Sequence, residues 1–301
     1  MAILIECIPN FSEGRDAGVI EALAAVAGNA PGVALLDYSA DADHNRSVFT
    51  LLGRPDGVAE AAFLMCRAAC ALIDMTKHAG GHPRIGATDV IPFVPIRECT
   101  IRECVDISVN VAKRIYGELG IPCFLYEESC TRESRRNLAD IRKGGFEGLP
   151  QKLLLDDWAP DFGERRIHPT AGASAVGARG PLVAFNVNLN TPDISIARKI
   201  AKKIRASDGG FTFCKAIGVM LADRGLAQVS MNMVNHEATP LHVVYDTIRE
   251  EAARLGVSVA GSELIGLAPA KALADCAAHY LNIENYDFDK QVLENHIMKM
   301  L

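Results

Sequence analysis

Apolar residues in the first third of the chain follow two periods, one typical of strands and one of helices. Short apolar runs of strand length lie at residues 3–9, 33–38, 48–52 and 90–96. Between them, apolar positions recur every three or four residues over residues 15–28 and again from 55 to about 75, which predicts amphipathic helices. The predicted order is βαββαβ, the split βαβ unit of ferredoxin-like folds.

The same order of elements returns after residue 182. The pattern predicts strands at residues 182–188, 215–221, 228–233 and 257–265, and helices at 193–206 and 239–255. The two halves share little residue identity, so the repeat is one of element order. We therefore predict an α+β chain with two ferredoxin-like βαββαβ subdomains, residues 1–178 and 179–301, and a ligand cleft between their sheets.

The stretch between the two repeats is less regular. The pattern predicts an amphipathic helix over residues 100–119 and a strand over residues 121–126. It predicts several helical pieces in the charged stretch of residues 132–152. Residues 156–179 are rich in Gly, Pro and Ala and have weak periodicity. This last stretch is typical of a long functional loop or a linker.

Charge and cysteine content narrow the classes of protein. The 301 residues carry a formal net charge of −6 and no basic run, which argues against nucleic acid as the main partner. The N-terminus lacks the pattern of a signal peptide, and its apolar stretch is too short to span a membrane. Nine cysteines at scattered spacing predict neither a disulfide framework nor a zinc site. We expect a cytoplasmic protein without a bound metal.

The most informative loop surrounds His82. Gly80 and Gly81 permit unusual backbone conformations, and Pro83 restrains the chain directly after the histidine. Such a loop between a helix and a strand can aim a side chain from a rigid frame. Imidazole is suited to proton transfer near neutral pH. From the loop alone, an acid–base role and a purely structural hydrogen bond remain equally open.

Several motifs in chain order resemble those of one family. They are GHPRIGATDVIPFVP at residues 81–95, ECIPNFSEG at 6–14, NRSV at 45–48, WAPDFG at 158–163, GAR at 177–179, AFNVNL at 184–189 and LAQVS at 226–230. Together these motifs resemble the formiminotransferases, the glutamate formimidoyltransferase family of histidine breakdown, over nearly the whole chain.

The resemblance implies a reaction and a set of roles. It implies transfer of a formimino group from N-formimino-L-glutamate to N5 of tetrahydrofolate, with His82 as the general acid/base. It also implies a homodimer and a tetrahydrofolate-contacting segment. Mammalian relatives fuse this region to a cyclodeaminase, which this sequence does not contain, so we expect a separate protein to close the ring of the product. The segment comprises Gly163, Glu164, Arg165, Arg166, Ile167, His168, Pro169, Thr170, Ala171 and Gly172.

Further residues are candidates for substrate binding. Arg46 and Arg84 suit the substrates' carboxylates, because guanidinium binds carboxylate bidentately, although each could equally form a surface ion pair. Asn10 and Asn45 suit a pterin edge, or they stabilise turns. Asp37, Asp41 or Asp43 could supply the carboxylate that orients His82, or they form a solvated acidic loop. The choice stays open because Ser39 stands where mammalian relatives carry an acid, two residues after the position of Asp37.

Three functions remain open at this point. The first is a formiminotransferase whose rate falls as pH drops through the His82 pKa. The second is a non-catalytic folate-binding protein with the same fold. The third is another one-carbon transferase, with a formyl or formiminoglycine donor. A poised imidazole favours an enzyme over a carrier, because binding alone does not require one.

Overall fold

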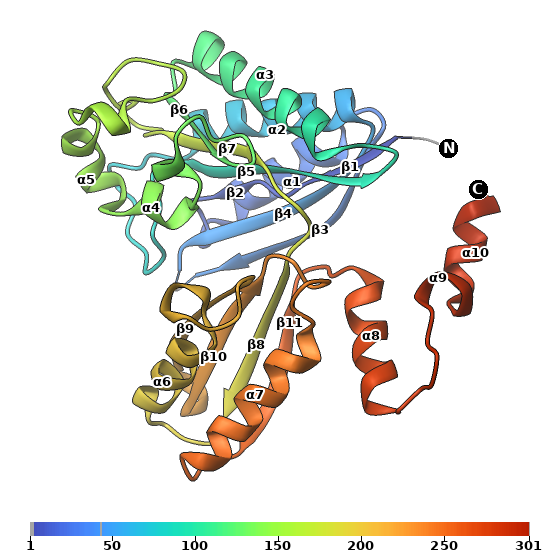
Figure 1. Ribbon diagram of the computed structural model, residues 1–301. Coiled ribbons are helices and arrows are strands. Elements are labelled where there is room, and N and C mark those ends of the chain that lie inside the picture. Colours follow the sequence, from blue (N-terminus) through green and yellow to red (C-terminus); the bar gives the residue numbers. More distant parts are fainter. Residues whose placement is uncertain (1–2, 43, 301) are drawn as a thin grey trace. The chain divides into compact units, whose positions relative to one another are not determined.

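The computed structural model describes residues 3–42 and 44–300, without the side chains of residues 223 and 298–300 (Figure 1). The chain forms two compact units, the first ending at Arg179 and the second beginning at Gly180. Both units mix helices with one sheet, which confirms the predicted α+β class. The predicted cleft between the two sheets stays a prediction. No helix in the described part of the chain is long and apolar enough to cross a bilayer.

The first unit begins with the predicted βαββαβ order. Its elements are β1 (Leu4–Cys7), β2 (Asn10–Phe11), α1 (Ala17–Gly28), β3 (Val33–Asp41), β4 (Arg46–Gly53), α2 (Pro55–Leu72) and β5 (Thr88–Arg97). β1 and β2 together occupy one position between β4 and β5, and β3 pairs with the other side of β4. This strand order is that of a ferredoxin-like sheet.

A second group of elements extends this sheet. It consists of α3 (Ile101–Leu119), β6 (Cys123–Glu127), α4 (Leu138–Arg142), α5 (Gly145–Lys152), β7 (Ser174–Ala178) and short 3₁₀ turns at Glu133–Arg135 and Asp156–Trp158. α3 begins at a capping box of Thr100 and Glu103 and ends at Gly120, whose φ is +69°. β7 lies between β5 and β6 and is parallel to both.

The position of β7 corrects one expectation. Residues 156–179 were expected to form a loop or linker, but Ser174–Ala178 form this internal strand. The strand was missed because, apart from Val176, its residues are Ser, Ala and Gly, which give no strand signal. β7 is buried along its whole length, so burial between two strands compensates for propensity.

Helices cover both faces of the extended part of the sheet. α1, α2 and α3 pack on one face (Figure 1), over a core that includes Phe11, Phe49 and Phe93. On the other face, Ile141 of α4 and Leu149 of α5 pack with residues of β5, β6 and β7. Burial on both faces explains why β5 reads as an almost unbroken apolar run.

The second unit repeats the βαββαβ order. Its elements are β8 (Val183–Leu189), α6 (Ile194–Ile204), β9 (Cys214–Leu221), β10 (Leu226–Met233), α7 (Leu241–Arg254) and β11 (Val259–Ile265), with short 3₁₀ turns at Ala206–Asp208 and Ala222–Arg224. The helices α8 (Ala270–Tyr280), α9 (Phe288–Gln291) and α10 (Leu293–Met300) follow. The four strands have the order β11-β8-β10-β9 and are all antiparallel to their neighbours. This is again the ferredoxin-like order, as predicted.

Candidate active site

The His82 loop joins α2 to β5 and is held by backbone contacts along its length. Met75 N donates to Thr170 O (2.8 Å), Asn45 Nδ2 donates to Ala79 O (3.1 Å), and Ser12 Oγ donates to Gly86 O (2.8 Å). Gly80 lies so close to the neighbouring chain that a Cβ there would be 2.4 Å from the carbonyl oxygen of His44. The loop is therefore restrained from three sides, and glycine at position 80 is a steric requirement.

The hydrogen bonds of His82 define its tautomer. Nδ1 lies 2.7 Å from the carbonyl oxygen of Pro83, which can only accept, so Nδ1 donates. Arg46 Nη1 lies 2.7 Å from Nδ1 and 3.0 Å from Nε2. A guanidinium can only donate, and the Pro83 contact leaves Nε2 as the acceptor although Nδ1 is the nearer of the two to Arg46 Nη1. His82 is thus a neutral imidazole with its basic nitrogen at Nε2.

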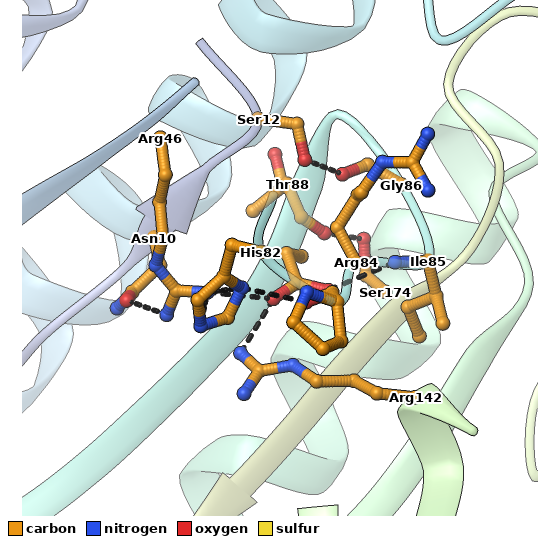
Figure 2. A network of polar contacts seen from close by, with 12 residues as sticks. Asn10, Ser12, Arg46, His82, Arg84, Ile85, Gly86, Thr88, Arg142 and Ser174 are labelled. Atoms are coloured by element: carbon orange, nitrogen blue, oxygen red, sulfur yellow. Dashed lines mark hydrogen bonds and ion pairs between the residues drawn. The ribbon is translucent and has the colours of Figure 1, made fainter. Parts of the chain in front are cut away.

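Three charged side chains surround this imidazole. Asp89 Oδ2 lies 2.5 Å from Arg142 Nη2 and 3.4 Å from Arg46 Nη1, and Asp89 Oδ1 accepts from Ile85 N at 3.0 Å. The Asp89 side chain is 2% exposed, against 16% for Arg46 and 13% for Arg142. Figure 2 shows the guanidinium groups of Arg46 and Arg142 turned toward the same point beside His82. One buried carboxylate therefore holds two shielded guanidinium groups.

These neighbours shift the pKa values at the site. Burial, followed by the charges of Arg46 and Arg142, lowers the pKa of His82 to about 3. Burial also lowers the pKa of Arg46 to about 10, with a further lowering from Arg142. Burial alone would raise the pKa of Asp89, but Arg142 and Arg46 hold it below its ordinary value. At neutral pH the site holds two cations, one anion and an uncharged imidazole.

Arg84 has different hydrogen-bond partners from Arg46. Its Nη1 and Nη2 contact the Glu147 carboxylate at 2.8 and 2.6 Å, and its Nε donates to His78 Nδ1 at 3.0 Å. His78 Nε2 in turn lies 3.0 Å from Asn45 O, so this imidazole is held at both nitrogens. Arg84 lines the same small pocket as His82 and Arg46, but its charge is already balanced by Glu147.

The two asparagines support the backbone around Arg46. Asn10 accepts from Arg46 Nη2 and donates from Nδ2 to Ile8 O (2.7 Å). Asn45 accepts from Gly14 N at 2.9 Å and has a φ of +49°, a left-handed conformation that asparagine tolerates better than most residues. Both are buried. The turn-stabilising alternative raised above therefore describes the contacts of Asn45, while Asn10 positions Arg46.

Two of the three candidate carboxylates for orienting His82, those of Asp37 and Asp41, have other surroundings. Asp37 is an exposed residue of β3, paired in the sheet with Thr50. Asp41 is exposed at the end of the same strand, and its Oδ1 accepts from His44 N at 2.8 Å. Asp43 lies outside the described residues. β3 runs to Asp41, beyond the end of the strand predicted over residues 33–38. The carboxylate that the structure brings next to His82 is that of Asp89.

The segment from Gly163 to Gly172 has two distinct parts. Glu164, Arg165 and Arg166 are exposed, and Arg165 pairs with Asp156 at 2.7 Å. His168 and Gly172 form a tight turn through reciprocal backbone hydrogen bonds of 2.8 and 3.0 Å. Ala171 O accepts from Ala87 N at 2.9 Å, and a Cβ on Gly172 would be 2.3 Å from Ile85 O. The second part is therefore a support behind the His82 loop.

Sequence reasoning missed Asp89 and Arg142. Asp89 was visible as a lone carboxylate inside an apolar strand, a signal that a charged partner is buried with it. Arg142 is one of many charges between residues 132 and 152, and no pattern singles it out. Within the described residues, no group of three or more His, Cys, Asp or Glu side chains could hold a metal ion.

Fold and site together define a class: a two-unit α+β protein in which one unit carries a neutral histidine among shielded arginines, suited to proton transfer on an anionic substrate. Two family models match the chain, "Formiminotransferase domain, N-terminal subdomain" over residues 4–179 and "Formiminotransferase domain" over residues 184–300. The chain belongs to the formiminotransferase family.

Some relatives match over their full length, and others are larger proteins of which about half matches. The glutamate formimidoyltransferase of Streptococcus pyogenes serotype M1 is 63% identical over 99% of this chain and 100% of its own length. That of Thermoplasma acidophilum is 43% identical over 98% of each chain. The formimidoyltransferase-cyclodeaminase of Sus scrofa is 44% identical over 95% of this chain and 54% of its own length. The similarity thus reaches proteins of the same extent as this one.

Proposed function

We propose that this protein transfers the formimino group of N-formimino-L-glutamate to N5 of tetrahydrofolate, giving 5-formiminotetrahydrofolate and L-glutamate in histidine degradation. The observation that carries the proposal is the state of His82, a neutral imidazole whose Nε2 points toward the shielded cation Arg46. A base of this kind can take a proton from a nitrogen nucleophile, and the cations beside it attract an anionic donor. The relatives named above support the choice of reaction.

The chemistry assigns His82 two successive proton transfers. N5 of tetrahydrofolate attacks the formimino carbon, and Nε2 of His82 takes the N5 proton. The protonated imidazole then gives this proton to the glutamate nitrogen as the bond between that nitrogen and the formimino carbon breaks. Arg46 positions the donor and Asn10 holds Arg46. Giving up this proton returns His82 to its neutral state, so the reaction needs no second acid or base.

Tetrahydrofolate is the proposed co-substrate, and no metal takes part. Within the segment from Gly163 to Gly172, the exposed residues Glu164, Arg165 and Arg166 are the part available to it. Arg165 and Arg166 suit the carboxylates of its glutamate tail. We propose a cytoplasmic homodimer that acts on small molecules, not on nucleic acid or membranes.

Steady-state transfer by the purified protein tests this function. N-formimino-L-glutamate, formiminoglycine and a formyl-folate donor are compared at equal concentration, and tetrahydrofolate binding is measured separately by calorimetry. We expect turnover with N-formimino-L-glutamate to exceed the other two. Tetrahydrofolate binding without any turnover would instead identify a carrier. Preference for another donor would reassign the protein to a different one-carbon transfer.

A further inference from the structure

The charges around His82 do not cancel. Arg46 and Arg142 contribute two positive charges and Asp89 one negative charge, while His82 is neutral. His44, whose ring centre lies 6.0 Å from that of His82, adds no negative charge. The ion pairs that Arg46, Arg142 and Asp89 form with one another therefore hold one more positive than negative charge. Arg46 and Arg142 are largely shielded from water, so this excess charge favours a bound anion.

Arg142 has donors that its partner does not use. Its contact with Asp89 involves Nη2. Its Nε is buried and, within the described residues, has no hydrogen-bond partner. A buried donor without a partner is costly, and a ligand oxygen that approaches this edge of the guanidinium removes the cost. Arg84 offers the opposite case, because Glu147 already occupies two of its nitrogens.

We propose that Arg142 is a substrate-binding residue which, together with Arg46, binds the α-carboxylate of the formimino donor beside His82, with Asp89 positioning both guanidinium groups. The inference rests on the proposed function and deepens it. Arg46 Nη1 is 3.0 Å from Nε2 of His82, so an anion at this point lies next to the reacting atoms. In N-formimino-L-glutamate only the α-carboxylate is that close, two covalent bonds from the leaving nitrogen. The carboxylates of tetrahydrofolate lie beyond its aminobenzoyl ring.

Occupation by a carboxylate also prepares His82 for its role. The positive charges of Arg46 and Arg142 oppose protonation of the imidazole in the ligand-free protein. A bound carboxylate balances the excess charge and accepts the hydrogen bond that Arg46 otherwise donates to Nε2. The base therefore becomes available when the donor is in place. Substrate selection and activation of His82 then depend on the same two arginines.

The experiment compares two donors that differ only in the α-carboxylate, N-formimino-L-glutamate and N-formimino-4-aminobutyrate. With the first donor, Arg142→Gln should lower kcat/KM by ~30-fold, as expected for a lost charged hydrogen bond. With the second, the same substitution should change kcat/KM by less than ~3-fold, because no group remains for Arg142 to bind. Arg142→Lys should retain part of the preference for the first donor, since it keeps the charge.

A matched control and a folding readout accompany these variants. Arg136→Gln removes the same charge from a side chain that is 45% exposed and pairs with Glu133 and Glu128, and it should leave both donors unaffected. Tetrahydrofolate binding should be unchanged in Arg142→Gln. If Arg142→Gln slows both donors equally, or slows neither, Arg142 does not bind the α-carboxylate. If wild-type protein transfers from neither donor, the proposed function itself fails, which is a different result.

Discussion

Each unit of this protein contains a polar network on a ferredoxin-like sheet, and the two networks differ in how their charges balance. In the second unit, Asn188 Nδ2 and Arg224 Nη1 donate to Glu263 Oε1 at 2.8 and 2.6 Å, and Gln228 Nε2 donates to Asn188 Oδ1 at 2.8 Å. One cation meets one anion. In the first unit, two cations meet one anion beside His82. The same topology thus supports a closed network in one unit and an open one in the other.

The comparison separates fold from function. The open network uses Arg46 and Asp89 from the βαββαβ core, but Arg142 comes from α4, which lies between β6 and β7. In the described part of the second unit, no strand follows the βαββαβ order and no helix corresponds to α4. The additional elements after β5 therefore supply the unbalanced charge. A ferredoxin-like unit by itself predicts no activity, and the side chains added to it define the site.

The largest expected effect comes from removing the base of the open network. His82→Asn keeps a polar side chain but has no basic ring nitrogen, so kcat should fall by ~10²–10⁴-fold. KM should change little, because the arginines that bind the donor remain. Steady-state kinetics with N-formimino-L-glutamate measures both constants. Turnover near the wild-type rate would show that His82 is a structural loop residue.

Removing the anion of the open network should be the next largest effect. Asp89→Asn leaves Arg46 and Arg142 facing each other without a counterion, which should lower the free energy of unfolding by ~3 kcal/mol. Urea unfolding at neutral pH measures this change. Asp106→Asn, on the exposed side of α3, should stay within ~0.5 kcal/mol of wild type. Equal stability of the two variants would contradict the structural role given to Asp89.

Asp89 also predicts the direction of the pH dependence of stability. Its folded-state pKa is depressed, so its contribution is present above the pKa of an unfolded aspartate, about 4, and is lost as pH falls through the folded value. Asp89→Asn should lack this loss. The difference in stability between the two proteins should therefore narrow on acidification.

A smaller effect than those of the substitutions is expected in the pH dependence of kcat and kcat/KM of the wild-type protein. An ordinary histidine base would make kcat/KM fall as pH drops below about 6.5. Because the pKa of His82 is lowered to about 3, kcat/KM should show no such fall near pH 6.5. The limb in kcat should lie at higher pH than that in kcat/KM, because a bound carboxylate offsets the arginine charges. Coincident limbs near pH 6.5 in both profiles would argue against a neutral, shielded His82.

The smallest effect is expected in the closed network. Glu263→Gln removes an ion pair whose arginine is 53% exposed, and the amide oxygen can still accept a hydrogen bond from Asn188 Nδ2. The free energy of unfolding should change by less than ~1 kcal/mol. Urea unfolding again supplies the measurement. A loss as large as that of Asp89→Asn would remove the contrast between the two networks.

Periodicity was sufficient to predict the βαββαβ order of both units, because each core face follows the period of its own element. It failed at β7, where a sequence of small residues gives no such signal. At the site, the Gly-Pro loop singled out His82 and guanidinium chemistry singled out Arg46, and the structure brings these two side chains together. The partner of Arg84 could not be predicted, since Glu147 is 63 residues away. Arg142 and Asp89 are 53 residues apart, and only the folded chain shows which charges meet.

The place of β7 in the sheet has a consequence for synthesis of the chain. β5 ends at Arg97, but the strand that covers its outer edge begins only at Ser174. During translation this edge of β5 stays without its final partner while more than seventy further residues emerge. Unpaired strand edges are prone to association between chains. The nascent first unit should therefore depend on chaperone protection until residue 178 has left the ribosome, and truncation before residue 174 should yield aggregates rather than a smaller folded unit.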